Sequence, residues 1–322
     1  MYRKYFEPEY GEVAPWVRKG NKIEHTSTEI KSWRTKWNFL ILSDLTNQFK
    51  DTYCYDDLMN VETEDVGLDR GDGVITLRIY HPAGQGPHPV MVFCHGGSWS
   101  LNNLDIYDYM LRYLAGEGGI AVVSVDYRLA PEFHFPVGIE DCYAALEWAA
   151  ENADSFGGDK DRITVCGDSS GGNFAAVVAL MARDRKGPGI RKQILIYPVT
   201  SFNFERAPDS AVRYGGGFYG LNTSREKPAR GENYLSKPED RFSPYASPME
   251  ETDFGGVAPA CFISAECDPL LDQALMYAAK LEDNGIDVEY HLYKGMTHAF
   301  INRPYQSTFE ALDAIIKAVP RD

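Results

Sequence analysis

The fold is decided by the stretch Arg162-Ile163-Thr164-Val165-Cys166-Gly167-Asp168-Ser169-Ser170-Gly171-Gly172. Its first five residues are typical of a short buried strand, and residues 173–183 continue as a largely apolar helix. The glycines permit a sharp turn between the two, where the pattern G-x-S-x-G exposes a serine hydroxyl beside the positive N-terminal end of a helix. Ser169 is therefore the candidate nucleophile, but the same pentapeptide is also compatible with an ordinary glycine-rich turn.

Short β-rich runs alternate with helical patterns on both sides of this turn, from about residue 74 onward. Several of the runs are continuously apolar, as in parallel strands that are buried on both faces. The sequence therefore predicts an α/β fold with a doubly wound, mostly parallel sheet flanked by helices. The expected strands are residues 74–80, 90–93, 120–125, 163–166, 193–197, 260–264 and 288–293, and the expected helices are residues 107–115, 138–153, 273–284 and 308–319.

Two regions do not follow this alternation. Residues 28–49 predict an amphipathic helix whose apolar stripe packs on the core, caps a binding cleft, or does both. The stripe consists of Ile30, Trp33, Trp37, Leu40, Ile41 and Leu45. Residues 201–253 are rich in Gly, Pro, Ser and charge, and such an irregular insertion is typical of a functional lid or a disordered loop. We therefore expect N-terminal cap helices in residues 1–60 and a catalytic domain in residues 61–322, with a cap or lid insertion at about 201–253.

The composition argues against several classes of partner. The chain has 322 residues and a formal net charge of -15, from 32 Lys and Arg against 47 Asp and Glu, so its surface should repel nucleic acids and anionic membranes. No apolar run reaches the roughly 18 to 20 residues of a membrane span, and residues 1–10 do not resemble a secretory signal. Six scattered cysteines without ligand spacing argue against a zinc site. We therefore expect a cytoplasmic protein without a metal or an organic cofactor.

A serine nucleophile requires hydrogen-bond donors that stabilise an oxyanion, and a second glycine motif can provide them. This motif is Cys94-His95-Gly96-Gly97-Ser98-Trp99, directly after the strand expected at residues 90–93. Glycines lack side chains, so their N–H groups can approach a substrate carbonyl closely. Gly96 and Gly97 are the predicted donors, with the N–H of Ser170 as the third, although this motif too is compatible with an ordinary turn.

The serine also requires a general base and an acid that orients the base. Of the seven histidines, His298 lies in the loop between the last expected strand and the last expected helix, where it could reach over the sheet. Asp268 follows the strand expected at residues 260–264 and precedes a proline that keeps it extended, while Glu266 is a second candidate. The order Ser169, Asp268, His298 is that of α/β-hydrolases rather than of chymotrypsin-like or subtilisin-like proteases.

Together these motifs resemble those of the hormone-sensitive-lipase-like carboxylesterases of the α/β-hydrolase superfamily. The resemblance covers roughly residues 65–320 and rests on residues 95–97, 127–132, 167–172, 268–270 and 295–300. It implies an α/β-hydrolase fold with a helical cap, selects Asp268 over Glu266, and assigns residues 127–132 to support of the oxyanion side. The chain departs from the family at Ser98, where a third glycine is usual, at residues 133–136, where the usual His-Pro-Phe-Pro order is permuted, and in its long insertion.

The resemblance implies a serine carboxylesterase in which Ser169 attacks an ester carbonyl and water then hydrolyses an acyl-enzyme. We expect small, water-soluble esters, from acetyl to about hexanoyl, as substrates, and a homodimer is compatible with the sequence. Trp99, Phe218 and Tyr219 are candidates either for the pocket wall or for core and lid packing. The alternatives are a related hydrolase of acetylated sugars, lactones or amides, and a non-catalytic ligand-binding protein of the same fold.

Overall fold

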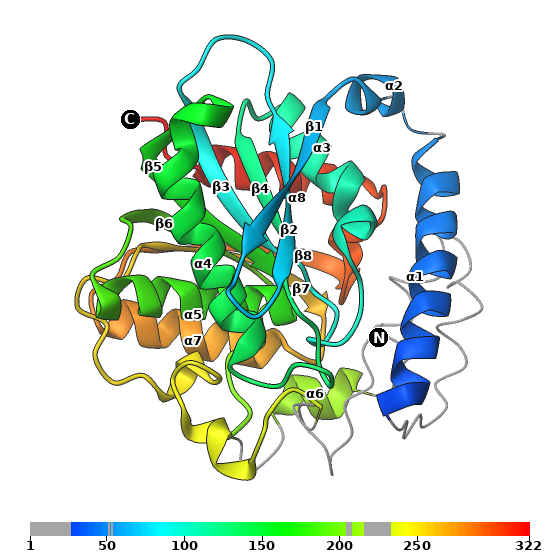
Figure 1. Cartoon of the computed structure of the whole chain (residues 1–322). Coiled ribbons are helices and arrows are strands. Elements are labelled where there is room, and N and C mark those ends of the chain that lie inside the picture. Colours follow the sequence, from blue (N-terminus) through cyan, green and yellow to red (C-terminus); the bar gives the residue numbers. More distant parts are fainter. Residues whose placement is uncertain (1–26, 51, 53, 204–207, 216–232) are drawn as a thin grey trace.

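A single mixed sheet forms the centre of the structure, a computed structural model that describes residues 27–50, 52, 54–203, 208–215 and 233–322 (Figure 1). Eight strands of this part of the chain follow the order β1-β2-β4-β3-β5-β6-β7-β8. The pairs β1/β2 and β2/β4 are antiparallel, and all other neighbours are parallel. The strands are β1 (Glu62–Asp69), β2 (Val74–His81), β3 (His88–Cys94), β4 (Ala121–Asp126), β5 (Gly158–Asp168), β6 (Ile190–Ile196), β7 (Ala260–Cys267) and β8 (Val288–Thr297).

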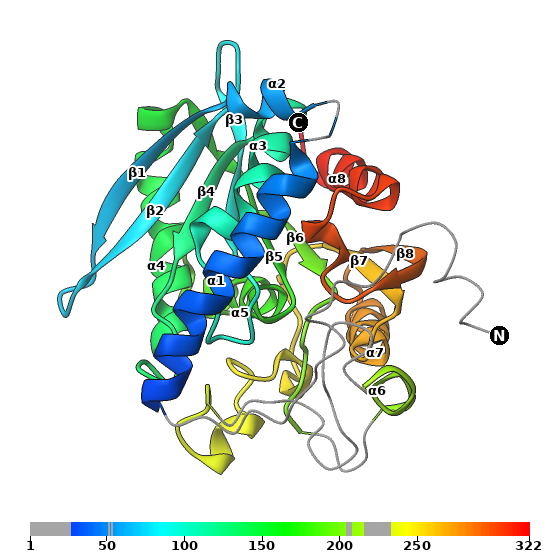
Figure 2. The ribbon, with the colours of Figure 1, turned by 90° about the vertical axis from the view of Figure 1, so that its right-hand side faces the viewer.

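Helices cover both faces of this sheet, as Figures 1 and 2 show. One face carries α4 (Val137–Asn152), α5 (Ser170–Arg185) and α7 (Leu271–Asp283). The other face carries α1 (Ser27–Phe49), α2 (Tyr55–Met59), α3 (Asp108–Gly116) and α8 (Gln306–Ala318). The predicted α/β fold, with a mostly parallel sheet between helices, is therefore confirmed. The remaining short elements are α6 (Asp209–Tyr214) and the 3-10 segments η2 (Leu104–Tyr107), η3 (Ala153–Phe156), η4 (Pro238–Phe242), η5 (Pro248–Glu250) and η6 (Phe300–Asn302).

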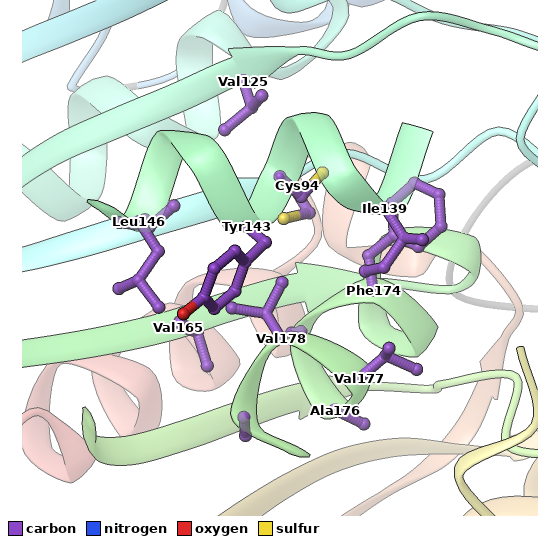
Figure 3. Close-up of a cluster of buried hydrophobic side chains, with 14 of the residues drawn as sticks. Cys94, Val125, Ile139, Tyr143, Leu146, Val165, Phe174, Ala176, Val177 and Val178 are labelled. Carbon is purple, nitrogen blue, oxygen red and sulfur yellow. The ribbon is translucent and has the colours of Figure 1, made fainter. Parts of the chain in front are cut away.

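Side chains of the central strands alternate between two buried clusters. In β4, Val123 and Val125 belong to the cluster beneath α4 and α5, whereas Val122 belongs to the cluster on the opposite face. Figure 3 shows part of the first cluster, where strand residues such as Val165 lie against α4 and α5 residues such as Leu146 and Val178. Because both faces are buried, these strands need apolar residues at nearly every position, which explains their continuously apolar sequences.

The sequence predicts the central strands and major helices but not the first strand. β1 carries the acidic run Glu62-Thr63-Glu64-Asp65, and these four residues are exposed. An edge strand pairs with only one neighbour, and this exposed half of β1 shows no apolar alternation that would reveal it. The short helices α2 and α6 were also not predicted. Elsewhere the observed elements differ from the predicted ones mainly at their ends.

The helix predicted at residues 28–49 is present as α1, but its buried stripe is narrower than expected. Figure 2 shows α1 lying along the outer side of its face of the sheet. Its buried positions are four residues apart, at Ile41, Leu45 and Phe49. Leu40 is 51% exposed, so its predicted place in the stripe is wrong; it lies on the edge of the helix that faces away from the sheet. The side chains of Ile30 and Trp33 lie outside the described residues.

The domain division stays a prediction, although the order of elements agrees with it. Both N-terminal helices end before residue 60, and the sheet begins at Glu62. In the expected insertion, α6 docks on the start of α7, where Ser210 N–H donates to Asp272 Oδ2 at 2.8 Å. Phe218 and Tyr219 lie outside the described residues, and so does most of Gly215-Gly216-Gly217.

Candidate active site

Ser169 lies between the end of β5 and the start of α5, in a backbone conformation that few residues adopt (φ 55°, ψ -116°). Such conformations cost about 1–3 kcal/mol and persist only where surrounding contacts fix them. Here the Ser169 N–H donates to the Ile196 carbonyl of β6 at 2.8 Å. A Cβ on Gly171 would lie 1.9 Å from the Cys94 carbonyl oxygen, so glycine is required for α5 to begin this close to β3. The G-x-S-x-G motif therefore forms the predicted strand-to-helix turn.

The three residues predicted to act together are in hydrogen-bond contact. His298 Nε2 lies 3.0 Å from Ser169 Oγ, and His298 Nδ1 lies 2.8 Å from Asp268 Oδ2. The second oxygen of Asp268 accepts a hydrogen bond from the Leu270 N–H at 2.8 Å, which fixes the carboxylate. All three side chains are buried. A hydroxyl, an imidazole and a carboxylate in this arrangement can activate the hydroxyl as a nucleophile.

Two opposing influences set the pKa of His298. Burial lowers it, because the charged imidazolium is poorly solvated inside the protein. The carboxylates of Asp268 and Asp168 outweigh burial, so the pKa is raised above its usual value of 6.5. The ring also packs against Tyr197, with 4.7 Å between the ring centroids. The base is therefore held in position and stabilised in the charged form that it adopts after taking a proton.

The other candidates for acid and base are occupied elsewhere. Glu266 Oε2 accepts a hydrogen bond from the Gly295 N–H at 2.8 Å, which links the ends of β7 and β8. His291 Nε2 lies 2.7 Å from Glu289 Oε1 on β8. His95 is fully buried, and burial lowers its pKa to about 4, so it is neutral at pH 7. His25 lies outside the described residues.

The structure requires a revision at the predicted oxyanion donors. The Gly96 N–H donates to Asp168 Oδ1 at 2.6 Å and to Tyr107 Oη at 3.1 Å, so it is turned into the protein and already has acceptors. The N–H groups of Gly97, Ser98 and Ser170 have no acceptor among the described residues. Gly96 is therefore wrong as a free donor. Gly97 and Ser170 remain candidates, and Ser98 is a further one.

Sequence reasoning missed Asp168, which it treated as a spacer within the pentapeptide. Its carboxylate is buried and accepts hydrogen bonds from Gly96 N–H, from Tyr107 Oη at 3.1 Å and from Tyr197 Oη at 3.3 Å. Burial raises its pKa, and these donors oppose that effect, which leaves a pKa of about 6. An ionisable residue directly before the nucleophile was the available signal. The carboxylate joins the turn that carries Ser169 to the loop after β3.

The predicted support of the oxyanion side by residues 127–132 is confirmed at two points. Tyr127 Oη donates to the His95 carbonyl at 2.7 Å, and its ring stacks on the His95 ring with centroids 4.3 Å apart. The Ala130 N–H donates to the Trp99 carbonyl at 2.8 Å. These residues therefore hold the backbone of the loop that follows β3.

One group outside the site, Cys261, Glu289 and His291 on β7 and β8, brings three potential metal-ligand atoms within 4.8 Å of one another. None of these three residues belongs to the hydrogen-bonded set of Ser169, His298 and Asp268. All six cysteines are free and buried. Among the described helices, none combines the length and apolarity that crossing a bilayer requires.

The chain is similar to known proteins over most of its length. Residues 91–302 match a family model described as alpha/beta hydrolase fold. The chain is 39% identical over 250 residues to the carboxylic ester hydrolase LipN of Mycobacterium tuberculosis, a match that covers 76% of this chain and 65% of LipN. It is 32% identical over 302 residues to an arylesterase of Saccharolobus solfataricus, with 94% of each protein covered. An esterase structure from Pyrobaculum calidifontis superimposes with a TM-score of 0.82 at 35% identity, covering 96% of this chain and 98% of that one.

We predict that Asp268→Asn lowers the pKa of His298. The substitution removes the neighbouring charge, so burial acts on the imidazolium with only Asp168 opposing it. We expect NMR titration of the imidazole signals to give a lower pKa in the variant than in the wild type. The matched control is Glu266→Gln, which neutralises a carboxylate bonded to Gly295 and should leave that pKa unchanged. An unchanged His298 pKa in Asp268→Asn would contradict the pairing.

Proposed function

We propose that this chain, which belongs to the alpha/beta hydrolase family and is a serine carboxylesterase, forms a covalent acyl-enzyme on Ser169. The observation that carries the proposal is the continuous line of hydrogen bonds from Ser169 Oγ through His298 to Asp268. A serine hydroxyl is a weak nucleophile at neutral pH, and a positioned imidazole supplies the base that it lacks. The sequence motifs of the hormone-sensitive-lipase-like family agree with this assignment.

In the first step, Ser169 Oγ attacks the carbonyl carbon of the ester while His298 Nε2 takes the hydroxyl proton. Asp268 keeps Nδ1 protonated and stabilises the positive charge that forms on the ring. When the tetrahedral intermediate collapses, the bond between the carbonyl carbon and the alkoxy oxygen breaks. His298 gives its proton to this oxygen, so an alcohol leaves and the acyl group stays on Ser169.

In the second step, His298 takes a proton from a water molecule, whose oxygen attacks the acyl carbon. Collapse of the second tetrahedral intermediate breaks the bond to Ser169 Oγ, and His298 returns the proton to that oxygen. The carboxylic acid is released and the hydroxyl is restored. The raised pKa of His298 favours the protonated ring that both intermediates require.

We assign stabilisation of the oxyanion to the N–H groups of Gly97, Ser98 and Ser170. Gly96 is left out because its N–H is bonded to Asp168. Ser170 is the first residue of the 16-residue helix α5, so its N–H also belongs to the positive end of the helix dipole. Loss of one such donor typically costs roughly 10² to 10³ in rate.

An aromatic cluster beside the nucleophile supports short acyl chains as substrates. Trp99 is buried, and its ring stacks on that of Tyr234 with centroids 4.8 Å apart. The ring of Phe202 also lies beside it, with 5.0 Å between the ring centroids. The Trp99 N–H donates to Ser170 Oγ at 3.3 Å, so this cluster adjoins the turn that carries the nucleophile. We infer that rings packed in this way leave little room for a long acyl chain. We therefore propose acetyl to about hexanoyl esters as substrates.

The alternative functions differ in whether they require the hydrogen bonds among Ser169, His298 and Asp268. Hydrolysis of acetylated sugars, lactones or amides would use the same groups, and no described contact favours one of these substrates. A non-catalytic protein has no need for an imidazole bonded to both Ser169 and Asp268. For the cellular setting, six free buried cysteines agree with a reducing compartment, and we propose the cytoplasm. The exposed edge strand β8 offers a surface for the proposed homodimer.

We predict that Ser169→Ala abolishes hydrolysis of p-nitrophenyl acetate while thermal unfolding stays close to that of the wild type, because a small buried hydroxyl is replaced by a smaller apolar group. A fluorophosphonate probe should label the wild type at Ser169 and leave this variant unlabelled. The control is Ser124→Ala, which removes a buried serine of β4 outside the site and should keep both activity and labelling. Full activity in Ser169→Ala would refute the nucleophile.

We predict that kcat/KM for p-nitrophenyl esters is highest between acetate and hexanoate and falls toward palmitate. The reason is the packed aromatic cluster next to Ser170, which limits the space for the acyl chain. Steady-state kinetics across an even-numbered series of acyl chains, below the micelle concentration of each ester, provides the measurement. A maximum at decanoate or longer would refute the short-chain proposal without affecting the nucleophile.

A further inference from the structure

We propose that α1 is a positioning element for the oxyanion donors, and that Arg34 and Asn38 hold the loop formed by residues 95–103, here called the oxyanion loop. The inference rests on the proposed function and deepens it. In this account the N-terminal helix fixes the backbone N–H groups that act on the transition state, in addition to covering part of the molecule. The residues named are positioning residues, because they touch the loop and not the reacting atoms.

The backbone of the oxyanion loop is strained and requires stabilising contacts. Gly97 has φ 131°, and three residues with side chains also have positive φ: Ser98 at 53°, Trp99 at 59° and Asn102 at 70°. A residue with a side chain in this region typically costs about 1–3 kcal/mol and persists only where its surroundings determine it. Within the loop, Ser100 N–H and Leu101 N–H both donate to the Gly97 carbonyl, and Asn102 Nδ2 donates to the Gly96 carbonyl. Contacts from other elements must therefore supply the remaining stabilisation.

Hydrogen bonds from the protein interior are concentrated at the start of the loop. Tyr127 holds the His95 carbonyl, and Asp168 and Tyr107 hold the Gly96 N–H. Further along, the Trp99 N–H reaches Ser170 Oγ at the longer distance of 3.3 Å. The part of the loop after Trp99 lies next to α1. Side chains of that helix form hydrogen bonds with its backbone.

Arg34 of α1 connects this outer part of the loop to the segment after β4. Its Nε donates to the Ser100 carbonyl at 2.6 Å and its Nη2 to the Ala130 carbonyl at 3.0 Å. The same guanidinium pairs with Glu132 at 2.8 Å. Because a guanidinium is planar and offers donors in a fixed fork, these bonds fix the two backbone carbonyls relative to each other. Ala130 in turn donates to Trp99, so the arginine holds the loop from two sides.

Asn38 and Trp37 of α1 hold the other end of the loop at Asn102. Asn38 Oδ1 accepts from the Asn102 N–H at 3.2 Å, and Trp37 Nε1 donates to Asn102 Oδ1 at 3.2 Å. Asn102 Nδ2 then donates to the Gly96 carbonyl at 3.0 Å. This carbonyl belongs to the peptide whose N–H is that of Gly97. A continuous line of hydrogen bonds thus runs from α1 to the first oxyanion donor.

The oxyanion donors act mainly in the tetrahedral intermediate, so the loop should affect kcat more than KM. The N–H groups bind most strongly to the negative oxygen of the tetrahedral intermediate, whereas the neutral ester gains less from them. A loosened loop should therefore lower kcat more than it raises KM. A helix that only covered the binding site would have the opposite signature, because it would change substrate affinity first.

The test uses Arg34→Met and Asn38→Ala in the full chain. We expect kcat for p-nitrophenyl acetate to fall about tenfold in Arg34→Met and about threefold in Asn38→Ala, with KM within about twofold of the wild type. A trifluoromethyl ketone, which forms an oxyanion adduct with a serine, should lose affinity by the same factors. Arg34→Lys should recover part of the loss, because an ammonium can still reach one carbonyl.

The matched control is Thr46→Val, which removes a different hydrogen bond of α1, from Tyr109 Oη of α3 to Thr46 Oγ1 at 3.1 Å. It weakens the docking of the helix without touching the oxyanion loop, so kcat should stay within about twofold. Thermal unfolding checks that each variant is folded. Asn38→Ala should fold, because it removes only one hydrogen-bond acceptor on a half-buried side chain.

Two outcomes would overturn the inference: unchanged kcat in both loop-directed variants, or equal losses in these variants and Thr46→Val. Either would leave the proposed function intact, because that function depends on the result for Ser169→Ala.

Discussion

The rest of the site depends on the hydrogen bond from the Gly96 N–H to Asp168 Oδ1, which is 2.6 Å long. It joins the loop after β3 to the turn after β5, and these strands are direct neighbours in the sheet. Asp168 precedes the nucleophile and Gly96 precedes the oxyanion donors, so one bond sets the distance between them. A Cβ on Gly96 would lie 2.5 Å from Asp168 Oδ2, which makes glycine necessary at this position. The glycine motifs of the two loops are therefore parts of one structural requirement.

The same bond brings a second acidic group close to the base. Asp268 contacts His298 directly, whereas the charge of Asp168 acts on it through space. Both carboxylates favour the imidazolium, and burial opposes it. The site thus stabilises a transient positive charge in a position from which water is largely excluded. Such stabilisation is strongest in a preorganised environment, and the contacts from Tyr107 and Tyr127 provide that rigidity.

The sequence predicted those features that depend on the order of elements and on the period of apolar residues. Ser169, Asp268 and His298 each follow a strand that can be recognised, and parallel strands bring their carboxyl ends to one edge of the sheet. The direction of a peptide N–H cannot be predicted in this way. Gly96 and Gly97 look alike in the sequence, but one N–H is turned toward Asp168 and the other has no acceptor among the described residues.

Other errors have similar physical reasons. Leu40 fits the helical period of α1, yet only a narrow edge of that helix is covered, so an apolar residue beside the stripe remains exposed. β1 is recognisable only through its pairing with β2, since half of it is acidic and faces solvent. The hydrogen bonds of Arg34 with Ser100 and Ala130, and those of Asn102 with α1, join residues that are 64 or more positions apart. No local pattern encodes such contacts.

The central claim is that an acyl group is transferred to Ser169 during turnover. The most direct measurement is mass spectrometry of the enzyme after rapid acid quenching during hydrolysis of p-nitrophenyl butyrate, followed by peptide mapping. We expect one butyryl group on the peptide that contains Ser169, formed within the dead time of steady-state assays and lost as substrate is exhausted. Hydrolysis without any acylated peptide, or with the acyl group on another residue, would contradict it.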